Sequence, residues 1–163
     1  MFEIIRLVFD VCLFKKGPQD LPCSSRLLRV LVIIDILVSF LMISIRTDWF
    51  ESLLQAMVSA LLIISFSGLM LYLGRKPERF YQTTSALLGT DTLISFFALP
   101  GIASLMLGKG AFLAFIVTIA FMTWHWAVTG HIIRNALGQT WTFSLGLAFL
   151  FIMGSYQVMA LLH

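Results

Sequence analysis

The sequence is poor in charge and in the residues that build soluble active sites. Only 12% of its 163 residues are charged, and it contains 2 cysteines and 4 prolines. Cys12 and Cys23 lack the C-x-x-C spacing of metal and redox sites and are interpreted as free thiols. Signatures of phosphate-binding loops, dinucleotide-binding loops, serine hydrolases and zinc proteases are missing from the sequence. We therefore expect a protein without enzymatic activity, metal or cofactor.

Long apolar runs dominate instead. Apolar residues make up 60% of the chain and form five blocks, at 27–45, 50–73, 80–107, 111–133 and 141–162. A membrane-spanning helix needs about 20 predominantly apolar residues, and no block shows the strict alternation of a barrel strand. The sequence predicts an all-α, polytopic membrane bundle of five transmembrane helices over 27–163. Pro100 and Gly101 predict that the third helix kinks or ends near Leu99.

Residues 1–26 form a separate unit ahead of the first span. Glu3, Arg6 and Asp10 recur at i, i+3 and i+7, so they share one stripe of a helix. Apolar side chains cover the rest of this helix: Phe2, Ile5, Val8, Phe9, Val11, Cys12 and Leu13. The pattern is typical of an amphipathic helix that lies in the membrane interface. A turn-rich cytoplasmic loop should follow it.

The basic residues are distributed unevenly between the two ends of this bundle. Nine fall on the side of the N-terminus: Arg6, Lys15, Lys16, Arg26, Arg29, Arg75, Lys76, Arg79 and Arg134. Only Arg46 and Lys109 fall on the other side. The positive-inside rule then predicts a cytoplasmic N-terminus and an outer C-terminus. The basicity therefore indicates topology rather than a nucleic-acid partner.

Five of these cations are candidate contacts for lipid headgroups. They precede the first span or lie in the loop between the second and third: Lys15, Lys16, Arg75, Lys76 and Arg79. Basic residues at the cytoplasmic surface attract anionic lipids. Membrane lipids are thus expected partners.

Asp35, Asp91 and His125 are ionisable residues within the apolar blocks. Counting 1.5 Å per residue from the inner end of each block places them at depths of ~12, ~16 and ~13 Å. A charge at mid-bilayer costs about 3 kcal/mol, so such residues usually face the bundle interior and have partners. At least two of the three should meet there. They would act either as a hydrogen-bonded clamp between helices or as a cation-binding or proton-relay cluster.

The fourth and fifth blocks contain the run WAVTGHIIRNALG, from Trp126 to Gly138, followed by TWTFSLGLAFLF. Together with RFYQTTSALLGTDTLI at the third block, these segments resemble the Yip-domain family of Ypt/Rab-interacting membrane proteins and their bacterial relatives. The resemblance covers about residues 27–162 and is to compact, bacterial-type members. It implies five spans with a cytoplasmic N-terminus in a bacterial cytoplasmic (inner) membrane, and no settled activity.

Two functions are consistent with these features. The first is a non-enzymatic membrane scaffold or accessory subunit of Yip-like fold, which binds other membrane proteins, lipid or further copies of itself. The second is a small proton- or cation-coupled transporter or channel built on Asp35, Asp91 and His125. An enzyme acting on lipid would need a catalytic motif that the sequence lacks. A hydrated cavity around the three residues would favour the transporter, and a dry contact the scaffold.

Overall fold

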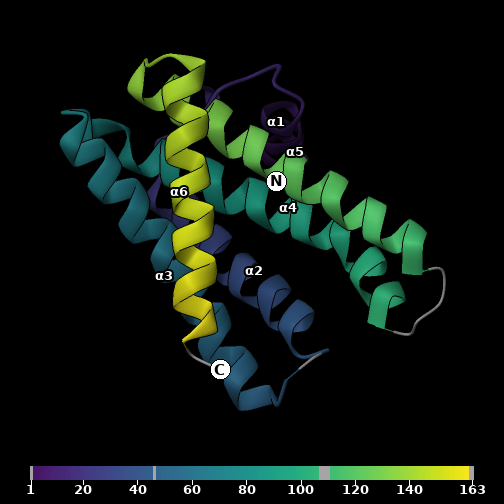
Figure 1. Ribbon diagram of the computed structural model, residues 1–163. Helices are drawn as coiled ribbons and strands as arrows, with labels where there is room; N and C mark the ends of the chain where they lie inside the picture. Colours follow the sequence, from purple (N-terminus) through teal and green to yellow (C-terminus); the bar gives the residue numbers. More distant parts are fainter. Residues whose placement is uncertain (1, 46, 107–110, 162–163) are drawn as a thin grey trace.

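The computed structural model describes residues 2–45, 47–106 and 111–161, and its regular elements are all helices (Figure 1). Six α-helices and two short 3₁₀ helices follow one another along the chain: α1 (Phe2–Cys12), η1 (Pro18–Asp20), α2 (Ser25–Ile43), α3 (Trp49–Leu73), η2 (Pro77–Arg79), α4 (Phe80–Met106), α5 (Ala111–Leu137) and α6 (Trp141–Ala160). The all-α prediction is confirmed for this part of the chain. Arg46 and Lys109, the two expected outer cations, lie outside the described residues.

The helix bounds follow the apolar blocks closely, with two differences. The helix α4 does not end near Leu99 but continues through Pro100 to Met106, so of the two predicted outcomes the helix end is wrong. A proline removes a single helical donor, and bundled helices tolerate this because neighbouring groups satisfy the freed carbonyl. The helix α5 extends beyond the predicted residue 133 to Leu137.

Three helices are long and apolar enough to cross a membrane: Trp49–Leu73, Phe112–Leu137 and Trp141–Ala160. The remaining two long helices are more polar. The helix α2 carries Arg26, Arg29 and Asp35, and α4 carries Thr and Ser residues throughout its first half. Three spans are therefore supported by length and composition, whereas the predicted number of five is not shown.

The helix α4 lies at the centre of the molecule, between α2 and α5 (Figure 1). Every residue from 83 to 90 is buried, because α1, α2, α3 and α5 all pack around this stretch. Its polar side chains therefore need partners inside the protein. Ser67 of α3 provides one, since its Oγ lies 2.6 Å from Oγ1 of Thr84. A central position explains why α4 is less apolar than its neighbours.

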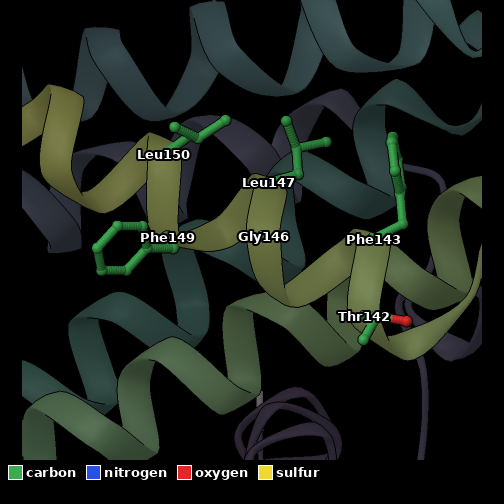
Figure 2. Close-up of a pocket in the computed structure, with 6 residues that line it drawn as sticks. All are labelled: Thr142, Phe143, Gly146, Leu147, Phe149 and Leu150. Carbon is green, nitrogen blue, oxygen red and sulfur yellow. The ribbon is translucent and has the colours of Figure 1, made fainter.

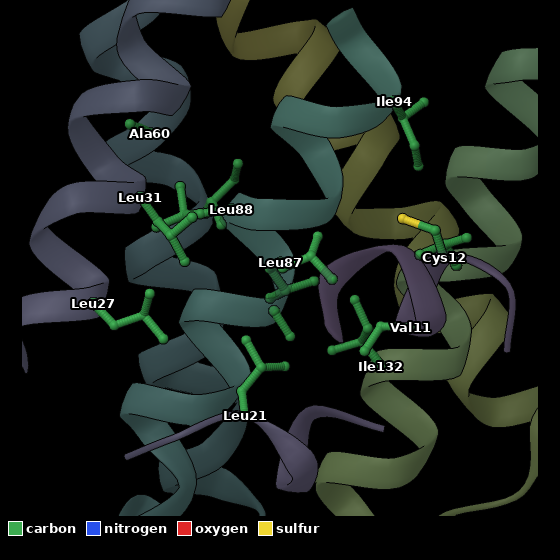
Figure 3. Close-up of a cluster of buried hydrophobic side chains, with 14 residues drawn as sticks. Val11, Cys12, Leu21, Leu27, Leu31, Ala60, Leu87, Leu88, Ile94 and Ile132 are labelled. Carbon is green, nitrogen blue, oxygen red and sulfur yellow. The ribbon is translucent and has the colours of Figure 1, made fainter. Parts of the chain in front are cut away.

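The helix α1 packs against the bundle instead of lying free of it. Val8, Val11 and Cys12 are buried, and Figure 3 shows Val11 and Cys12 beside Leu87 of α4 and Ile132 of α5. The backbones approach closely at this contact: a Cβ on Gly89 of α4 would lie only 3.0 Å from Cγ2 of Val8. The sequence predicts an amphipathic helix here but not its docking.

Side chains at one end of the bundle tie neighbouring helices together. Lys76 Nζ donates to Leu137 O at 2.8 Å, and Arg79 donates to Asn135 O and Ala136 O, each at 3.2 Å. These bonds satisfy carbonyls that the last turn of α5 leaves free, and cations there also complement the helix dipole. The chain then turns at Gly138, which has a φ of 71°. The continuation of α5 to Leu137 therefore depends on Lys76 and Arg79, which are distant in sequence.

Candidate functional site

The three ionisable residues predicted to lie inside the membrane come together from three helices. Asp35 is on α2, Asp91 on α4 and His125 on α5. These helices pack side by side, with α4 in the middle. We call Asp35, Asp91, His125 and the adjoining Thr92 the polar cluster. The depth argument from the sequence is consistent with this arrangement.

Asp35 is the innermost member of the polar cluster and is fully buried. Its Oδ1 accepts a hydrogen bond from Thr92 Oγ1 at 2.9 Å, which joins α2 to α4. Its Oδ2 is also buried and has no hydrogen-bond donor among the described residues. The neighbouring acid is Asp91. One oxygen of Asp35 is therefore satisfied by a hydrogen bond and the other is not.

Asp91 and His125 form the contact between α4 and α5. His125 Nε2 lies 3.1 Å from Asp91 Oδ1, and the side chains are 30% and 17% exposed, respectively. Because a carboxylate only accepts, Nε2 must carry the proton in this bond. Exposure falls from His125 through Asp91 to the completely buried Asp35. The polar cluster thus runs from the surface of the bundle to its interior.

This geometry connects helices. Two shallow hollows of the described structure lie elsewhere, one along α6 from Thr142 to Leu150 and one at the end of α3 around Tyr72 and Arg75. Within the described residues, no group of three or more His, Cys, Asp or Glu side chains is placed to hold a metal ion. The contacts within the polar cluster are those of an interhelical clamp that also contains ionisable groups.

The five candidate lipid-contact residues divide into two groups. Lys76 and Arg79 direct their charged ends to the carbonyls of α5, so they serve the fold. Lys15, Lys16 and Arg75 are exposed, although Lys16 Nζ lies 4.0 Å from Asp10 Oδ2. The latter three are therefore the ones whose charges face outward.

Two further polar contacts hold the N-terminal segment and were not predicted from the sequence. Trp124 Nε1 donates to Cys12 O at 3.0 Å, and His131 Nε2 donates to Lys16 O at 2.9 Å. Both join residues more than 100 positions apart. The sequence offers no periodic signal for contacts of this kind. His131 is buried, and this contact occupies its Nε2.

Comparisons of the chain with protein-family models, with curated proteins and with solved structures find no match. The function must therefore be argued from the fold and from these contacts.

Proposed function

We propose that this chain is a non-enzymatic integral membrane protein of Yip-like fold that serves as a scaffold or accessory subunit for other membrane proteins. In this proposal all five long helices cross the bilayer. At 1.5 Å per residue, the 19 residues of α2 and 27 of α4 measure about 29 and about 40 Å, against a hydrocarbon core of about 30 Å. The packing of α4 between α2 and α5 supports a shared span.

The proposed orientation has a cytoplasmic N-terminus and an outer C-terminus, in a bacterial inner membrane. It rests on the cations gathered where α3 ends and α4 begins, at Arg75, Lys76 and Arg79, and on Arg134 near the end of α5. Contacts between η2 and the end of α5 support a common basic end.

The surface of α1 supports an interfacial position for that helix. Its residues divide into a buried sector with Val8 and Val11, an exposed apolar sector and a charged sector. The apolar sector holds Phe2, Ile5 and Phe9, and the charged sector holds the exposed Glu3 and Arg6 and the half-buried Asp10. A helix at the boundary between lipid and water, docked against protein, needs these three sectors. Lys15, Lys16 and Arg75 would then meet anionic headgroups.

The observation that carries the scaffold proposal is the exposed face of α6. Of its residues only Ser144 and Ala148 are buried. Figure 2 shows Gly146 between Leu147 and Leu150 on one side and Phe149 on the other, along a shallow apolar hollow. A Cβ added at Gly146 or at Gly154 would meet nothing within 4 Å. Small residues let two membrane helices approach closely, so this face suits a helix of another membrane protein.

Photocrosslinking in intact cells tests this proposal. A photoreactive residue replaces Leu150, and the control replaces Phe115 of α5, which is also exposed and apolar. We expect a discrete protein adduct from position 150 that Gly146→Leu abolishes without lowering the thermal stability, because the larger side chain fills the hollow. An adduct of twice the chain's mass would identify self-association. Lipid adducts alone, or the same bands from both positions, would refute the scaffold.

The second candidate is the proton- or cation-coupled transporter. The meeting of Asp35, Asp91 and His125 favours it, whereas the position of the hollows does not. Its test is ion flux in liposomes. A transporter would show a pH-dependent flux that Asp91→Asn abolishes, because an amide cannot exchange a proton. Equal leakage from liposomes with the wild type and the variant would exclude this candidate.

A further inference from the structure

The buried oxygen of Asp35 needs a hydrogen atom that no described side chain provides. Oδ2 has no donor among the described residues, and the carboxyl group of Asp91 lies near that of Asp35. Ionised carboxylates only accept hydrogen bonds, so two of them in contact repel each other. A single proton between them turns the contact into a hydrogen bond and removes one buried charge. A proton held between the two carboxyl groups would supply this hydrogen.

We infer that Asp35 and Asp91 bind one exchangeable proton between α2 and α4, and that His125 is the group through which this proton enters and leaves. The charges balance in this arrangement. The two acids with one proton carry a single negative charge, and a protonated His125 at 3.1 Å from Asp91 neutralises it. The inference deepens the site of the second candidate function but requires no transport.

The order of burial defines the route. His125 is the most exposed of the three side chains, Asp91 lies next to it, and Asp35 is completely enclosed. A protonated imidazole transfers its Nε2 proton to Asp91 Oδ1 and remains as the neutral form that is protonated at Nδ1. Asp91 then shares this proton with Asp35. Release follows the same steps in reverse, and the imidazole returns its proton to the medium.

Other titratable groups near these helices are occupied or face away. On α1, Glu3 and Arg6 are exposed, and Asp10 lies beside Lys16. Cys12 is on the buried face of α1, but burial raises the pKa of its thiol to about 12, so it keeps its proton near neutral pH. The remaining groups on the packed elements lie toward helix ends or in turns: Asp20, Arg26, Arg29, Glu51, Tyr72, Glu78, Arg79, Tyr81, His131, Arg134 and Tyr156. The charged group acting on Asp35 is Asp91.

Infrared difference spectroscopy of the full chain in lipid nanodiscs tests the inference. We expect the carbonyl band of a protonated carboxyl group at neutral pH, with a shift in deuterated water and loss of the band when the pH is raised. Asp35→Asn and Asp91→Asn should each remove this band, because each variant leaves one carboxyl group without a second carboxyl group to share the proton. Asp48→Asn, at the exposed start of α3, is the matched control and should leave the band unchanged.

His125→Gln distinguishes the entry route from the binding site. The glutamine side chain can still donate to Asp91 but cannot accept and pass on a proton, so the band should remain while its exchange after a pH jump slows at least tenfold. An unchanged exchange rate would overturn the role of His125. Absence of the band from folded wild-type protein at neutral pH would overturn the shared proton, and this measurement needs no variant. Neither result affects the crosslinking at α6, so failure of the scaffold is seen separately.

Discussion

The contact between α1 and α4 leads to a quantitative prediction for Gly89→Val. A Cβ at this position would lie 3.0 and 3.3 Å from the two methyl groups of Val8, and 3.8 Å from a methyl group of Leu31. The β-branched side chain of Val8 has few alternative rotamers, so the contact cannot relax locally. The further methyl groups of the introduced valine deepen the clash. We expect α1 to leave its place on the bundle more often.

The magnitude follows from the cost of overpacking. Extra methyl groups in a well-packed contact typically cost about 1–3 kcal/mol. The clash exists only while α1 is docked, so the substitution destabilises the docked state and not the undocked one. The population of undocked α1 should then rise between about 5-fold and about 150-fold, since about 1.4 kcal/mol corresponds to a factor of ten.

Alkylation of Cys12 measures this population. Cys12 lies on the buried face of α1, whereas Cys23 is exposed and is replaced by serine for the experiment. Burial raises the pKa of the Cys12 thiol to about 12, so the docked form stays a protonated and unreactive thiol through mildly alkaline pH. Labelling by a maleimide therefore reports the undocked state. Gly89→Val should speed labelling by the factor given above.

Gly146→Val is the matched control, because the same change on α6 meets nothing within 4 Å. It should leave the labelling of Cys12 unchanged. Val8→Ala combined with Gly89→Val should restore part of the protection, because the alanine removes the methyl groups that clash. Rapid labelling of Cys12 in the wild type, or equal labelling in Gly89→Val and Gly146→Val, would refute the docking of α1.

Three further changes test other contacts by thermal unfolding in detergent. Ser67→Ala alone leaves the buried hydroxyl of Thr84 without its partner and should cost about 1–3 kcal/mol, whereas adding Thr84→Val should recover most of the loss; an additive double variant would contradict the pairing. Arg79→Met removes two bonds to the end of α5 and should cost about 1–2 kcal/mol, with amide exchange faster in the last turn of α5 than elsewhere. Asp91→Leu should be less stable than Asp91→Asn by about 1–3 kcal/mol, because only the amide can still accept from His125, and equal melting temperatures would exclude the clamp.

The sequence predicts the positions of the long helices well because each apolar block is bounded by turn-forming or charged residues. The block at 50–73, for example, appears as a helix from Trp49 to Leu73. The prediction was less accurate where a helix end depends on distant residues. The predicted block ends at residue 133, but α5 continues to Leu137 because Lys76 and Arg79 from another part of the chain support its last turn.

The polar cluster could be predicted in part from the sequence. A rise of 1.5 Å per residue is enough to place Asp35, Asp91 and His125 at one level, and the structure brings these residues together. The helical rise does not tell which side chains pair. Thr92 is adjacent to Asp91 in sequence, yet it donates to Asp35, because the pairing depends on how α2 and α4 are rotated toward each other. The docking of α1 onto Gly89 depends on tertiary packing in the same way.

Solid-state NMR in lipid bilayers tests whether Asp91 and His125 meet inside the membrane bundle. Protein with ¹⁵N-labelled histidine and ¹³C-labelled aspartate should show a through-space correlation between His125 Nε2 and the carboxyl carbon of Asp91, which Asp91→Asn, having no labelled carboxyl there, should eliminate. The distance of 3.1 Å between His125 Nε2 and Asp91 Oδ1 makes this correlation strong at short mixing times. Correlations from His125 to lipid acyl chains, with none to an aspartate carboxyl, would contradict the contact between His125 and Asp91.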